Sequence, residues 1–599
     1  MVHPFSLLST VQLVLTARNA SAAYDYVIVG GGTAGMLLAN RLSANPRITV
    51  AIVEAGSSAF NNPNVTYVPK SIAEFGLGFN TSVEWGYTTE HQKYAANDSL
   101  PYWAGKGIVG STLINGMTYV RAEKRQIDAW EELGNEGWNW KSLDKYYVEQ
   151  ESFLTPSEQQ RVNGATFEES AHGYEGGLDV GITPYITGQR AFDVLRETHE
   201  AQGYVWNKDV NTGNMPGFCT WPMTLDASKV VREDAARAFH YPVQERPNLH
   251  VFLNSTASHI LWTDLDDASD RTASGVQIVR SDGTMRTLQA IEEVIVAAGS
   301  IRSPAILELS GIGNPSVLRS LGIETVVALP SVGSNLQDQP ANGIVYSSPT
   351  NWTGYSTFAS FLTASDLFGP DLSSVTASVK ANLTSWASTI LSDYVPNATT
   401  LAIQERLLQH QLDLVFTSNS TVPLAEILWA PIGNAIVAQF WNLLPFSRGS
   451  IHINSTNPIS QPSINPNFFQ LPIDTLVQAA IAVRVRKLFA TPPLSQHVTA
   501  EVTPGFSAVP RNASFADKRW ATWIKGSFSG NSHPVTTCAM MGSELGGVVD
   551  SEGKVYGTCN VRVVDASIFP TQISGHLSAS VYALAGKIAD AVLKKAEKV

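Results

Sequence analysis

Cysteine is scarce in this chain, whose 599 residues contain only Cys219, Cys538 and Cys559. Three cysteines are too few for a disulfide-stabilised scaffold, and no Cys-x-x-Cys pair indicates a zinc site. One bridge plus one free thiol stays open, with Cys538 and Cys559 as the closer pair in sequence. The sequence therefore predicts no metal centre.

The chain also lacks an excess of basic residues. It has 40 Lys and Arg against 52 Asp and Glu, a formal net charge of −12 and a pI of about 5.5. A nucleic-acid-binding protein needs a basic face, so we expect no nucleic-acid partner. The acidic residues are spread along the chain, which is typical of a soluble acidic surface.

Long hydrophobic runs, internal repeats and low-complexity tracts are missing too. Beyond the N-terminus no segment has about eighteen uninterrupted apolar residues, so the sequence predicts no membrane span. With 599 residues, 44% of them hydrophobic, the chain can bury a large core and is too long for one simple domain.

Residues 1–23 have the features of a weak secretory signal peptide. The segment from Phe5 to Ala17 is mostly apolar, although polar residues interrupt it, and Ala20-Ser21-Ala22 supplies small residues for cleavage. An unusual number of N-x-Ser/Thr glycosylation acceptors also favours export. These acceptors are Asn64, Asn80, Asn97, Asn254, Asn351, Asn382, Asn397, Asn419, Asn454 and Asn512. Together the two signals predict a secreted, N-glycosylated protein whose mature chain begins near Tyr24.

A dinucleotide-binding motif follows directly. Tyr24 to Val29 reads as a buried parallel strand, Met36 to Leu42 as a helix, and Arg47 to Val53 as a second strand. The glycine-rich turn GGGTAG, residues 30–35, joins the first strand to the helix. This is a complete βαβ unit with the Gly-x-Gly-x-x-Gly fingerprint.

Each polar or glycine position of this unit has a physical reason. Gly30 permits the tight turn, Gly32 lets the backbone approach a pyrophosphate, and Gly35 lets the helix lie close to the strand. The helix N-terminus offers N–H groups to phosphates, and Glu54 lies where an acid binds a ribose hydroxyl. The alternative is an ordinary glycine-rich turn; the motif alone does not distinguish FAD from NAD.

The rest of the chain is less regular. Strands are predicted at Leu249–Leu253, Gly275–Val279 and Glu293–Ala297. Residues 341–445 read as helical stretches mixed with loops. The C-terminus returns to a strand at Asn560–Val564 and a helix from about Ser578 to Lys595. A dinucleotide domain whose parts begin and end the chain implies that a second domain is inserted between them.

Several further segments carry a resemblance to a known family. Gly105–Asn115 reads GKGIVGSTLIN, Gly299–Gly313 reads GSIRSPAILELSGIG, and Gly333–Gln339 reads GSNLQDQ. With the C-terminal HPVTTCAMM and VVDASIFPTQISGH, these motifs resemble the glucose–methanol–choline (GMC) flavoprotein oxidoreductases over nearly the whole mature chain. Phrases such as LGNEGWNW and REDAARA are most similar to those of fungal FAD glucose dehydrogenases and glucose oxidases.

The resemblance implies an α/β fold, α+β overall, in which a Rossmann-like FAD-binding domain of the glutathione-reductase type carries an inserted substrate domain on an antiparallel sheet. It implies that 24–340 is mainly the FAD-binding domain, with 61–100 and 150–230 contributing to the substrate side. Residues 341–540 would be mainly the substrate-binding domain, and 541–599 the return to the FAD-binding domain.

The resemblance also implies which residues bind FAD. They are Gly30, Gly32, Thr33, Ala34, Gly35, Glu54, Gly110, Ser111, Asn115, Ala257, Asp565 and Ala566. The chain departs from the family pattern at Val109 and Thr536, where glycine is usual. A side chain at Val109 is expected to shift the loop near the flavin.

Alcohol oxidation by a flavin needs a base for the hydroxyl proton, and histidine suits that role because its pKa lies near working pH. Of the 12 histidines, His533 and His576 fall on the family's paired active-site positions, with His533 preferred as the base. Glu426 matches the position of a carboxylate that orients the second histidine and fixes its tautomer. The alternatives are two packed loop histidines and an ordinary surface or strand-end glutamate.

The substrate positions depart from those of the glucose enzymes. Ser529 replaces an arginine, and Phe75 aligns with a tyrosine, whereas Trp441 and Asn531 are retained. A sugar needs many directed hydrogen bonds, and each unpaired polar group costs about 1–3 kcal/mol. The sequence therefore favours a small aromatic or secondary-metabolite alcohol as substrate, with oxygen or a quinone-like compound as electron acceptor and a monomer or homodimer as the assembly.

Three other functions remain open. One is oxidation of glucose by a dehydrogenase or oxidase. A second is a non-redox cyclase or lyase of GMC type that uses the same histidine. The third is a flavin-free interaction or storage protein, against which the intact cofactor and base motifs argue.

Overall fold

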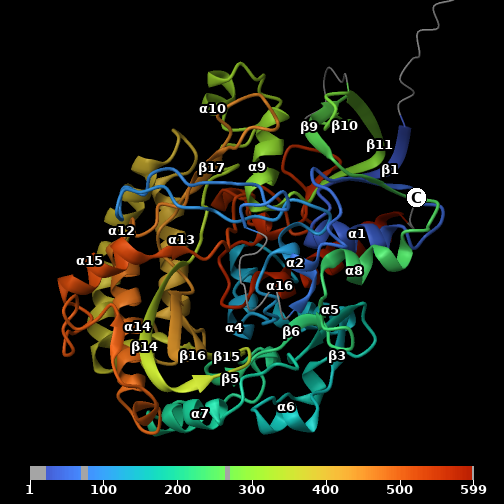
Figure 1. The fold of residues 1–599 in the computed structure, drawn as a ribbon. Helices are drawn as coiled ribbons and strands as arrows, with labels where there is room; N and C mark the ends of the chain where they lie inside the picture. Colours follow the sequence, from blue (N-terminus) through green and yellow to red (C-terminus); the bar gives the residue numbers. More distant parts are fainter. Residues whose placement is uncertain (1–21, 69–78, 264–269, 597–599) are drawn as a thin grey trace, which may run out of the picture.

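The structure, a computed structural model, describes residues 22–68, 79–263 and 270–596. The chain forms two large sheets, each with its own helices (Figure 1). The expected signal peptide falls almost entirely outside the described residues, apart from Ala22 and Ala23, which begin the first strand.

The first large sheet has seven strands in the order β8-β2-β1-β11-β10-β9, with β21 also paired to β11. These strands are β1 (Ala22–Val29), β2 (Val50–Val53), β8 (Leu249–Phe252), β9 (Ser255–Trp262), β10 (Ala273–Arg280), β11 (Met285–Val296) and β21 (Val561–Val563). Strand β1 pairs in parallel with β2 and β11, and β21 pairs in parallel with β11, whereas β9, β10 and β11 form an antiparallel meander. The strands predicted from the sequence in this part of the chain are confirmed.

The βαβ unit folds as its sequence indicates. Helix α1 (Thr33–Leu42) starts directly after the glycine-rich turn and crosses from β1 to β2. Tyr26–Val29 of β1 and all of β2 are buried, because a parallel strand covered by helices on both faces has no solvent face. On this side α1 packs against α16 (Leu577–Ala596), so the helices nearest the two ends of the chain share one face.

The second large sheet is antiparallel and has six strands, ordered β19-β14-β16-β15-β5, with β20 paired to β14. They are β5 (Gly217–Thr220), β14 (Pro340–Trp352), β15 (Phe358–Leu362), β16 (Ala425–Asn442), β19 (Glu501–Thr503) and β20 (Ser529–Gly530). Helices α12, α13, α14 and α15 lie on its side of the molecule (Figure 1).

The interpretation of residues 341–445 as helices and loops was wrong for three strands, β14, β15 and β16. Strand β14 has 13 residues and β16 has 18. Their register, from Ala341 opposite Trp441 to Ser347 opposite Ala435, joins segments about a hundred residues apart. Such pairing is set by non-local contacts that a local reading of hydrophobic periodicity does not capture.

The remaining elements connect these sheets. The smaller strands are β3 (Glu151–Leu154), β4 (Leu178–Gly181), β6 (Met223–Asp226), β7 (Val231–Arg232), β12 (Ile312–Gly313), β13 (Val327–Ala328), β17 (Ser450–His452) and β18 (Ser463–Asn465). The other helices are α2 (Pro63–Thr66), α4 (Lys124–Asp128), α5 (Trp140–Gln150), α6 (Glu158–Val162), α7 (Ala191–Ala201), α8 (Ala235–Phe239), α9 (Gly299–Leu309), α10 (Pro315–Ser320), α11 (Ala364–Phe368), α12 (Leu372–Asp393), α13 (Leu401–Val415), α14 (Pro472–Phe489) and α15 (Lys518–Ser527).

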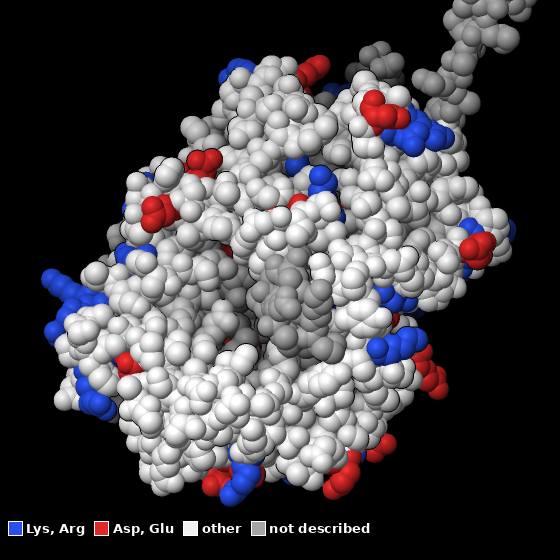
Figure 2. Space-filling model, in the orientation of Figure 1, with Lys and Arg blue, Asp and Glu red and all other residues white. Residues whose placement is uncertain are grey.

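Two large hydrophobic cores correspond to the two sheets. One contains Val27, Ile52 and Val294 of the parallel sheet, and the other contains Phe361 and Phe440 of the antiparallel sheet. On the face in Figure 2 charged side chains of both signs are scattered, without a basic patch. Among the described residues no helix is long and apolar enough to cross a membrane, and no cluster of metal-binding side chains occurs.

The cysteines are unpaired in this structure. Cys219 and Cys538 are buried and Cys559 is exposed, so the open question of a bridge between Cys538 and Cys559 is answered by two free thiols.

A buried ion pair fixes the returning C-terminal strand to the parallel sheet. Arg562 on β21 makes two contacts with Glu293 on β11, at 2.6 and 3.1 Å, and both side chains are at most 2% exposed. Burial alone would raise the pKa of Glu293, but the hydrogen bonds and charges of Arg562 and Lys595 outweigh it and leave this pKa lowered.

We expect Arg562→Met to lower the free energy of unfolding by about 3–5 kcal/mol, because it leaves a buried carboxylate poorly compensated. Lys595→Met is the control: this lysine contacts the same Glu293, but its side chain is 51% exposed, so its loss should cost less than about 1 kcal/mol. Denaturant unfolding measures both. Because the folded pKa of Glu293 is lowered, its contribution should be present above the unfolded pKa and disappear as pH falls through the folded one. Equal effects of the two substitutions would contradict this assignment.

Candidate active site

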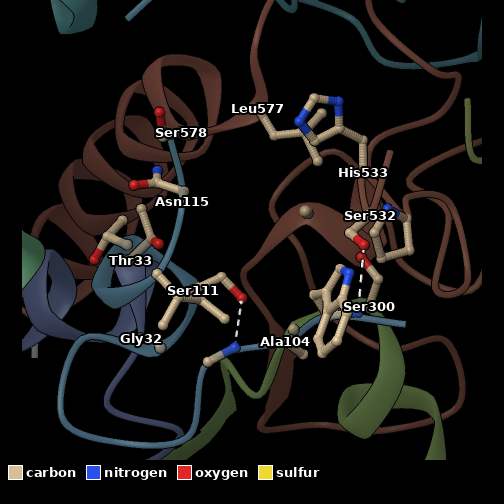
Figure 3. A pocket seen from close by; sticks show the side chains of 18 of the residues that line it. Gly32, Thr33, Ala104, Ser111, Asn115, Ser300, Ser532, His533, Leu577 and Ser578 are labelled. Carbon is tan, nitrogen blue, oxygen red and sulfur yellow. Dashed lines mark hydrogen bonds between the residues drawn. The ribbon is translucent and has the colours of Figure 1, made fainter. Parts of the chain in front are cut away.

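A cavity of about 940 Å³ is lined by residues from both large sheets, and this volume is typical of a cofactor and small-molecule site. It brings together most of the residues singled out from the sequence. Those that line it are Gly30, Gly32, Thr33, Ala34, Glu54, Gly110, Ser111, Asn115, Ala257, Trp441, Ser529, Asn531, His533, Asp565, Ala566 and His576. Figure 3 shows Gly32, Ser111 and Asn115 on one side of the cavity and Ser532 and His533 on the other.

Three residues from the predicted set do not line the cavity. Gly35 lies behind the turn, and Glu426 lies behind His576. Phe75 falls outside the described residues, so its predicted place in the substrate pocket has no structural counterpart here.

The glycine-rich turn has the geometry that its sequence predicts. Gly30 has a φ of 111°, a conformation that favours glycine. A Cβ on Gly35 would lie 2.0 Å from the carbonyl oxygen of Gly30, so only glycine lets α1 approach β1 this closely. At Gly32 a Cβ would meet nothing closer than 3.9 Å, so the backbone there is open to the cavity.

Glu54 ends β2 and its carboxylate faces the same turn. Its Oε2 accepts from the backbone N–H of Gly31 at 3.0 Å, and its Oε1 from that of Gly56 at 2.7 Å. Burial raises the pKa of Glu54 to about 7, against the opposing effect of these backbone donors. Each oxygen keeps a further lone pair for a ligand hydroxyl.

The Gly105–Asn115 loop covers the turn from the other side. It ends in a short 3-10 helix, Gly110–Leu113, and is closed by a hydrogen bond from Gly105 N to Ser111 Oγ at 3.2 Å (Figure 3). Asn115 Oδ1 accepts from Arg232 at 2.7 Å, which fixes the end of the loop.

Both departures from the family's glycines fall where the backbone is left-handed. Val109 has a φ of 109° and Thr536 a φ of 74°. A β-branched residue there costs on the order of 1–3 kcal/mol and persists only where its surroundings hold it. At Val109 the N–H donates to Gly31 O at 2.7 Å and the carbonyl accepts from Thr112 Oγ1 at 2.9 Å. The left-handed backbone is thus kept in spite of the side chain.

Asp565 follows β21 and joins two elements at the cavity. Its Oδ2 accepts from Gly299 N at 2.8 Å and from Ser303 Oγ at 2.6 Å, both at the start of α9. Its Oδ1 accepts from Ser567 N at 2.8 Å and so caps the short helix that begins at Ala566. These bonds fix the position of Ala566 in the cavity wall.

His533 and His576 face each other with ring centroids 5.3 Å apart and planes at 80°. They reach this position from a loop after β20 and from the loop before α16. The Nδ1 of His533 lies 2.8 Å from Gln339 Oε1, and its backbone N–H donates to Asp338 at 2.8 Å. Burial, followed by repulsion from His576, lowers the pKa of His533 to about 3. The ring is therefore neutral at ordinary pH, so one of its nitrogens carries a free lone pair.

His576 has a different partner. Its Nε2 lies 3.0 Å from Glu426 Oε1, so it donates to that carboxylate and leaves Nδ1 for a ligand in the cavity. Glu426 lies within β16 and is 1% exposed, which excludes the alternative of a surface glutamate. The edge of His576 packs against Trp441, with ring centroids 6.1 Å apart.

The far end of the cavity is built on the antiparallel sheet. Trp441, Ala341 and Ser529 are opposite one another on β16, β14 and β20, so their side chains share one face of the sheet. Further lining residues here are mostly aromatic or apolar: Trp221, Tyr355, Leu428, Trp429, Pro431 and Val437.

Charge is nearly absent from the described lining. Its carboxylate and basic side chains are Glu54, Arg302 and Asp565, and each is bound by the protein itself. Arg302 donates to Tyr87 Oη at 2.7 Å and to the carbonyls of Pro458 and Ser460. The described space next to the histidines is thus uncharged.

Gln339 is a buried residue at the site whose role the sequence alone does not indicate. It is the last residue of GSNLQDQ, one of the segments that resemble the GMC family. Its position directly before β14 is the one feature of the sequence that could have indicated a role. Its contact with His533 could not be predicted, because the two residues are 194 positions apart.

Comparison with known proteins identifies the family of the chain. Two family models, both described as GMC oxidoreductase, match residues 24–341 and 445–585. A glucose oxidase-like protein, fsoC, from Humicola fuscoatra is 41% identical over 580 residues, covering 96% of each chain. A glucose oxidase from Aspergillus carbonarius is 37% identical over 581 residues, covering 96% of this chain and 93% of that protein.

Solved structures agree on the fold. An FAD-dependent oxidoreductase from Chaetomium thermophilum superposes with a TM-score of 0.86 at 28% identity, covering 96% of this chain and all of that chain. A fungal aryl-alcohol oxidase has the same fold, with a TM-score of 0.82 at 24% identity over 96% of this chain and 99% of its own. The chain therefore belongs to the GMC oxidoreductase family, whose members are FAD-dependent enzymes that oxidise CH–OH groups.

Proposed function

We propose that this chain is a secreted FAD-dependent oxidoreductase of a small aromatic or secondary-metabolite alcohol, rather than of glucose. The observation that carries the substrate class is the wall of the cavity beside His533 and His576. Among the described residues that wall is uncharged and largely aromatic or apolar, with Ser529, Asn531 and Gln439 among its polar members.

The residues present fit FAD. The open backbone at Gly32 and the N-terminus of α1, with Thr33 and Ala34, suit a pyrophosphate. Glu54 has the lone pairs for a ribose hydroxyl, and Ala257 lines the same end of the cavity. Gly110, Ser111, Asn115, Asp565 and Ala566 would hold the flavin half. When bound, FAD supplies the acceptor for the substrate hydride.

The histidines act on the substrate hydroxyl. His533 is neutral, and its Nε2 takes the hydroxyl proton as the C–H bond breaks. His576 is oriented by Glu426 and presents Nδ1 as a second hydrogen-bonding group. Asn531, two residues before His533, lines the cavity and adds an amide group for the substrate.

The same geometry argues against a sugar. An arginine in place of Ser529 would project from the face of the sheet that also carries Trp441. The two positions are two strands apart, which is roughly 10 Å. Here a short hydroxyl occupies that position, and Trp441, Trp429 and Tyr355 contribute aromatic rings to the wall. Several sugar hydroxyls would lose their hydration without partners, at about 1–3 kcal/mol each.

We extend the proposal to the organisation of the chain. Residues 24–340 and 541–599 would form the FAD-binding domain, and 341–540 the substrate-binding domain, with 61–100 and 150–230 contributing to the substrate side. The start of β14 at Pro340 supports this boundary. Oxygen or a quinone-like compound would reoxidise the flavin, and the assembly would be a monomer or homodimer.

The test of the reaction is anaerobic mixing of the purified enzyme with a panel of alcohols, followed by the flavin absorbance. Aromatic alcohols should bleach the flavin faster than glucose does. Bleaching by glucose at the higher rate would favour the sugar reading, and bleaching by no alcohol would favour a non-redox reaction. Admitting air to the reduced enzyme then distinguishes oxygen from another acceptor.

We expect His533→Ala to lower the rate of flavin reduction by about 10²-fold or more, because the proton acceptor is lost. The exposed His91, whose ring contacts Asn97 O at 2.8 Å and lies outside the cavity lining, provides the control His91→Ala with an unchanged rate. Stopped-flow absorbance and the FAD content of each variant are the measurements. Near-native reduction by His533→Ala would make His576 the candidate base.

Ser529→Arg should raise kcat/KM for glucose relative to the native alcohol, because specificity is differential binding in the transition state. The ratio of the two kcat/KM values, measured before and after substitution, is the result to compare. Efficient glucose oxidation by the wild type would show that Ser529 is a tolerated variant with no part in selection.

We also expect the native protein to be exported with N-linked glycans and a mature N-terminus near Tyr24. None of the ten acceptor asparagines is buried in the structure, which supports their modification. N-terminal sequencing and the gel shift after deglycosylation test this. An unglycosylated native protein that retains Met1 would rule it out.

A further inference from the structure

Gln339 lies behind His533 and is completely buried. It directly precedes β14, and its backbone carbonyl accepts from the N–H of Asn531 at 2.9 Å. This bond continues the pairing of β14 with β20 up to the loop that carries His533.

The orientation of the Gln339 amide is fixed by two backbone carbonyls. Its Nε2 donates to Leu443 O at 2.9 Å and, more weakly, to Ile573 O at 3.4 Å. Carbonyl oxygens only accept hydrogen bonds, so a flipped amide would place oxygen against oxygen at both sites. The Oε1 atom must therefore face His533.

This orientation determines which nitrogen of His533 carries the proton. Gln339 Oε1 lies 2.8 Å from His533 Nδ1, and an amide oxygen can only accept there. Nδ1 must donate, which leaves the lone pair on Nε2. Asn531 Nδ2 lies 3.2 Å from the same Oε1 and 3.1 Å from Nδ1 itself. The shorter 2.8 Å contact of Nδ1 is with an atom that can only accept, so Nδ1 keeps its proton and the Asn531 amide donates to Oε1.

We propose that Gln339 is a positioning residue that holds His533 in the tautomer with the proton on Nδ1 and the lone pair on Nε2. The inference rests on the proposed role of His533 as the base. It means that proton abstraction depends on an amide that never touches the substrate.

The two histidines are thus oriented by chemically different partners. His576 donates to the carboxylate of Glu426, whereas His533 donates to a neutral amide. A carboxylate stabilises an imidazolium by its charge, but an amide orients the ring with much less of that effect. The other ionisable groups at His533 are Asp338, which accepts its backbone N–H, and Tyr102 beside Asp338.

The first test compares two substitutions in the holoenzyme. Gln339→Met removes the acceptor and should lower the rate of flavin reduction by the native alcohol about 10–100-fold, with the substrate's apparent Kd little changed. Gln339→Glu keeps an acceptor at Nδ1, and its other oxygen, when protonated, can donate to Leu443 O as the amide did. This variant should recover most of the rate.

Gln411→Met is the matched control. Gln411 is also buried, its Nε2 also donates to two carbonyls, of Leu444 and Pro445, and its Oε1 also accepts, from Arg448. Gln411 lies on α13 outside the cavity lining. Its substitution therefore measures how far the loss of any buried glutamine lowers the rate. The proposal is overturned if Gln339→Met is no slower than Gln411→Met, or if Gln339→Glu is no faster than Gln339→Met.

A second measurement does not depend on turnover. Nitrogen-15 NMR of histidine-labelled oxidised enzyme, with the His533 signal assigned by its loss in His533→Ala, reports the tautomer directly. We expect a protonated Nδ1 in the wild type and a mixture of tautomers in Gln339→Met. A protonated Nε2 in the wild type would overturn the inference. If the tautomers are as expected but His533→Ala keeps near-native turnover, the role of Gln339 stands and only the assignment of His533 as the base is refuted.

Discussion

The arrangement of this site depends on the return of the chain to its first sheet. Strand β21 pairs with β11 next to β1, and the buried contact between Arg562 and Glu293 holds it there. From that strand the chain passes through Asp565 and a loop to His576, and then into α16, which packs against α1. The short parallel pairing of β21 with β11 therefore fixes the positions of Asp565 in the cavity wall and of His576 relative to the turn at Gly30.

The charges around the cavity are arranged so that none is left unpaired in the described wall. The charged groups of the described cavity wall are each bound by backbone or neighbouring side chains, and His533 is held neutral by its burial and by His576. In a poorly hydrated site an unpaired charge would be costly, and it would also bind water that competes with the substrate for the base. The proposed base is thus kept neutral by its burial and by His576, while the carboxyl group of Asp338 accepts its backbone N–H and not a ring N–H.

Local sequence features predicted the parts of the fold that local physics determines. The βαβ unit, the C-terminal strand and α16 follow from runs of apolar residues and from a turn that requires glycine at Gly30 and Gly35. Strands β14 and β16 were missed because their pairing joins residues about a hundred positions apart. Val109 and Thr536 were seen as departures, yet their left-handed backbone could not be read from β-branched residues that usually avoid it. The role of Gln339 depends on carbonyls of Leu443 and Ile573, and no sequence pattern indicates that they meet.

The scaffold also separates chemistry from selectivity. His533 and His576 project from loops fixed by Gln339, Glu426 and the backbone of Val120, whose carbonyl accepts from His576 N at 3.1 Å. Ser529, in contrast, belongs to a regular β-ladder opposite Ala341, where a side chain can change without altering the backbone bonds. A substitution at such a position changes what the cavity wall offers to a substrate and leaves the histidine geometry intact. Such a separation would let the substrate class diverge within one family without a change in the histidine geometry, as the proposed preference for an aromatic alcohol requires of a chain 37% identical to a glucose oxidase over 581 residues.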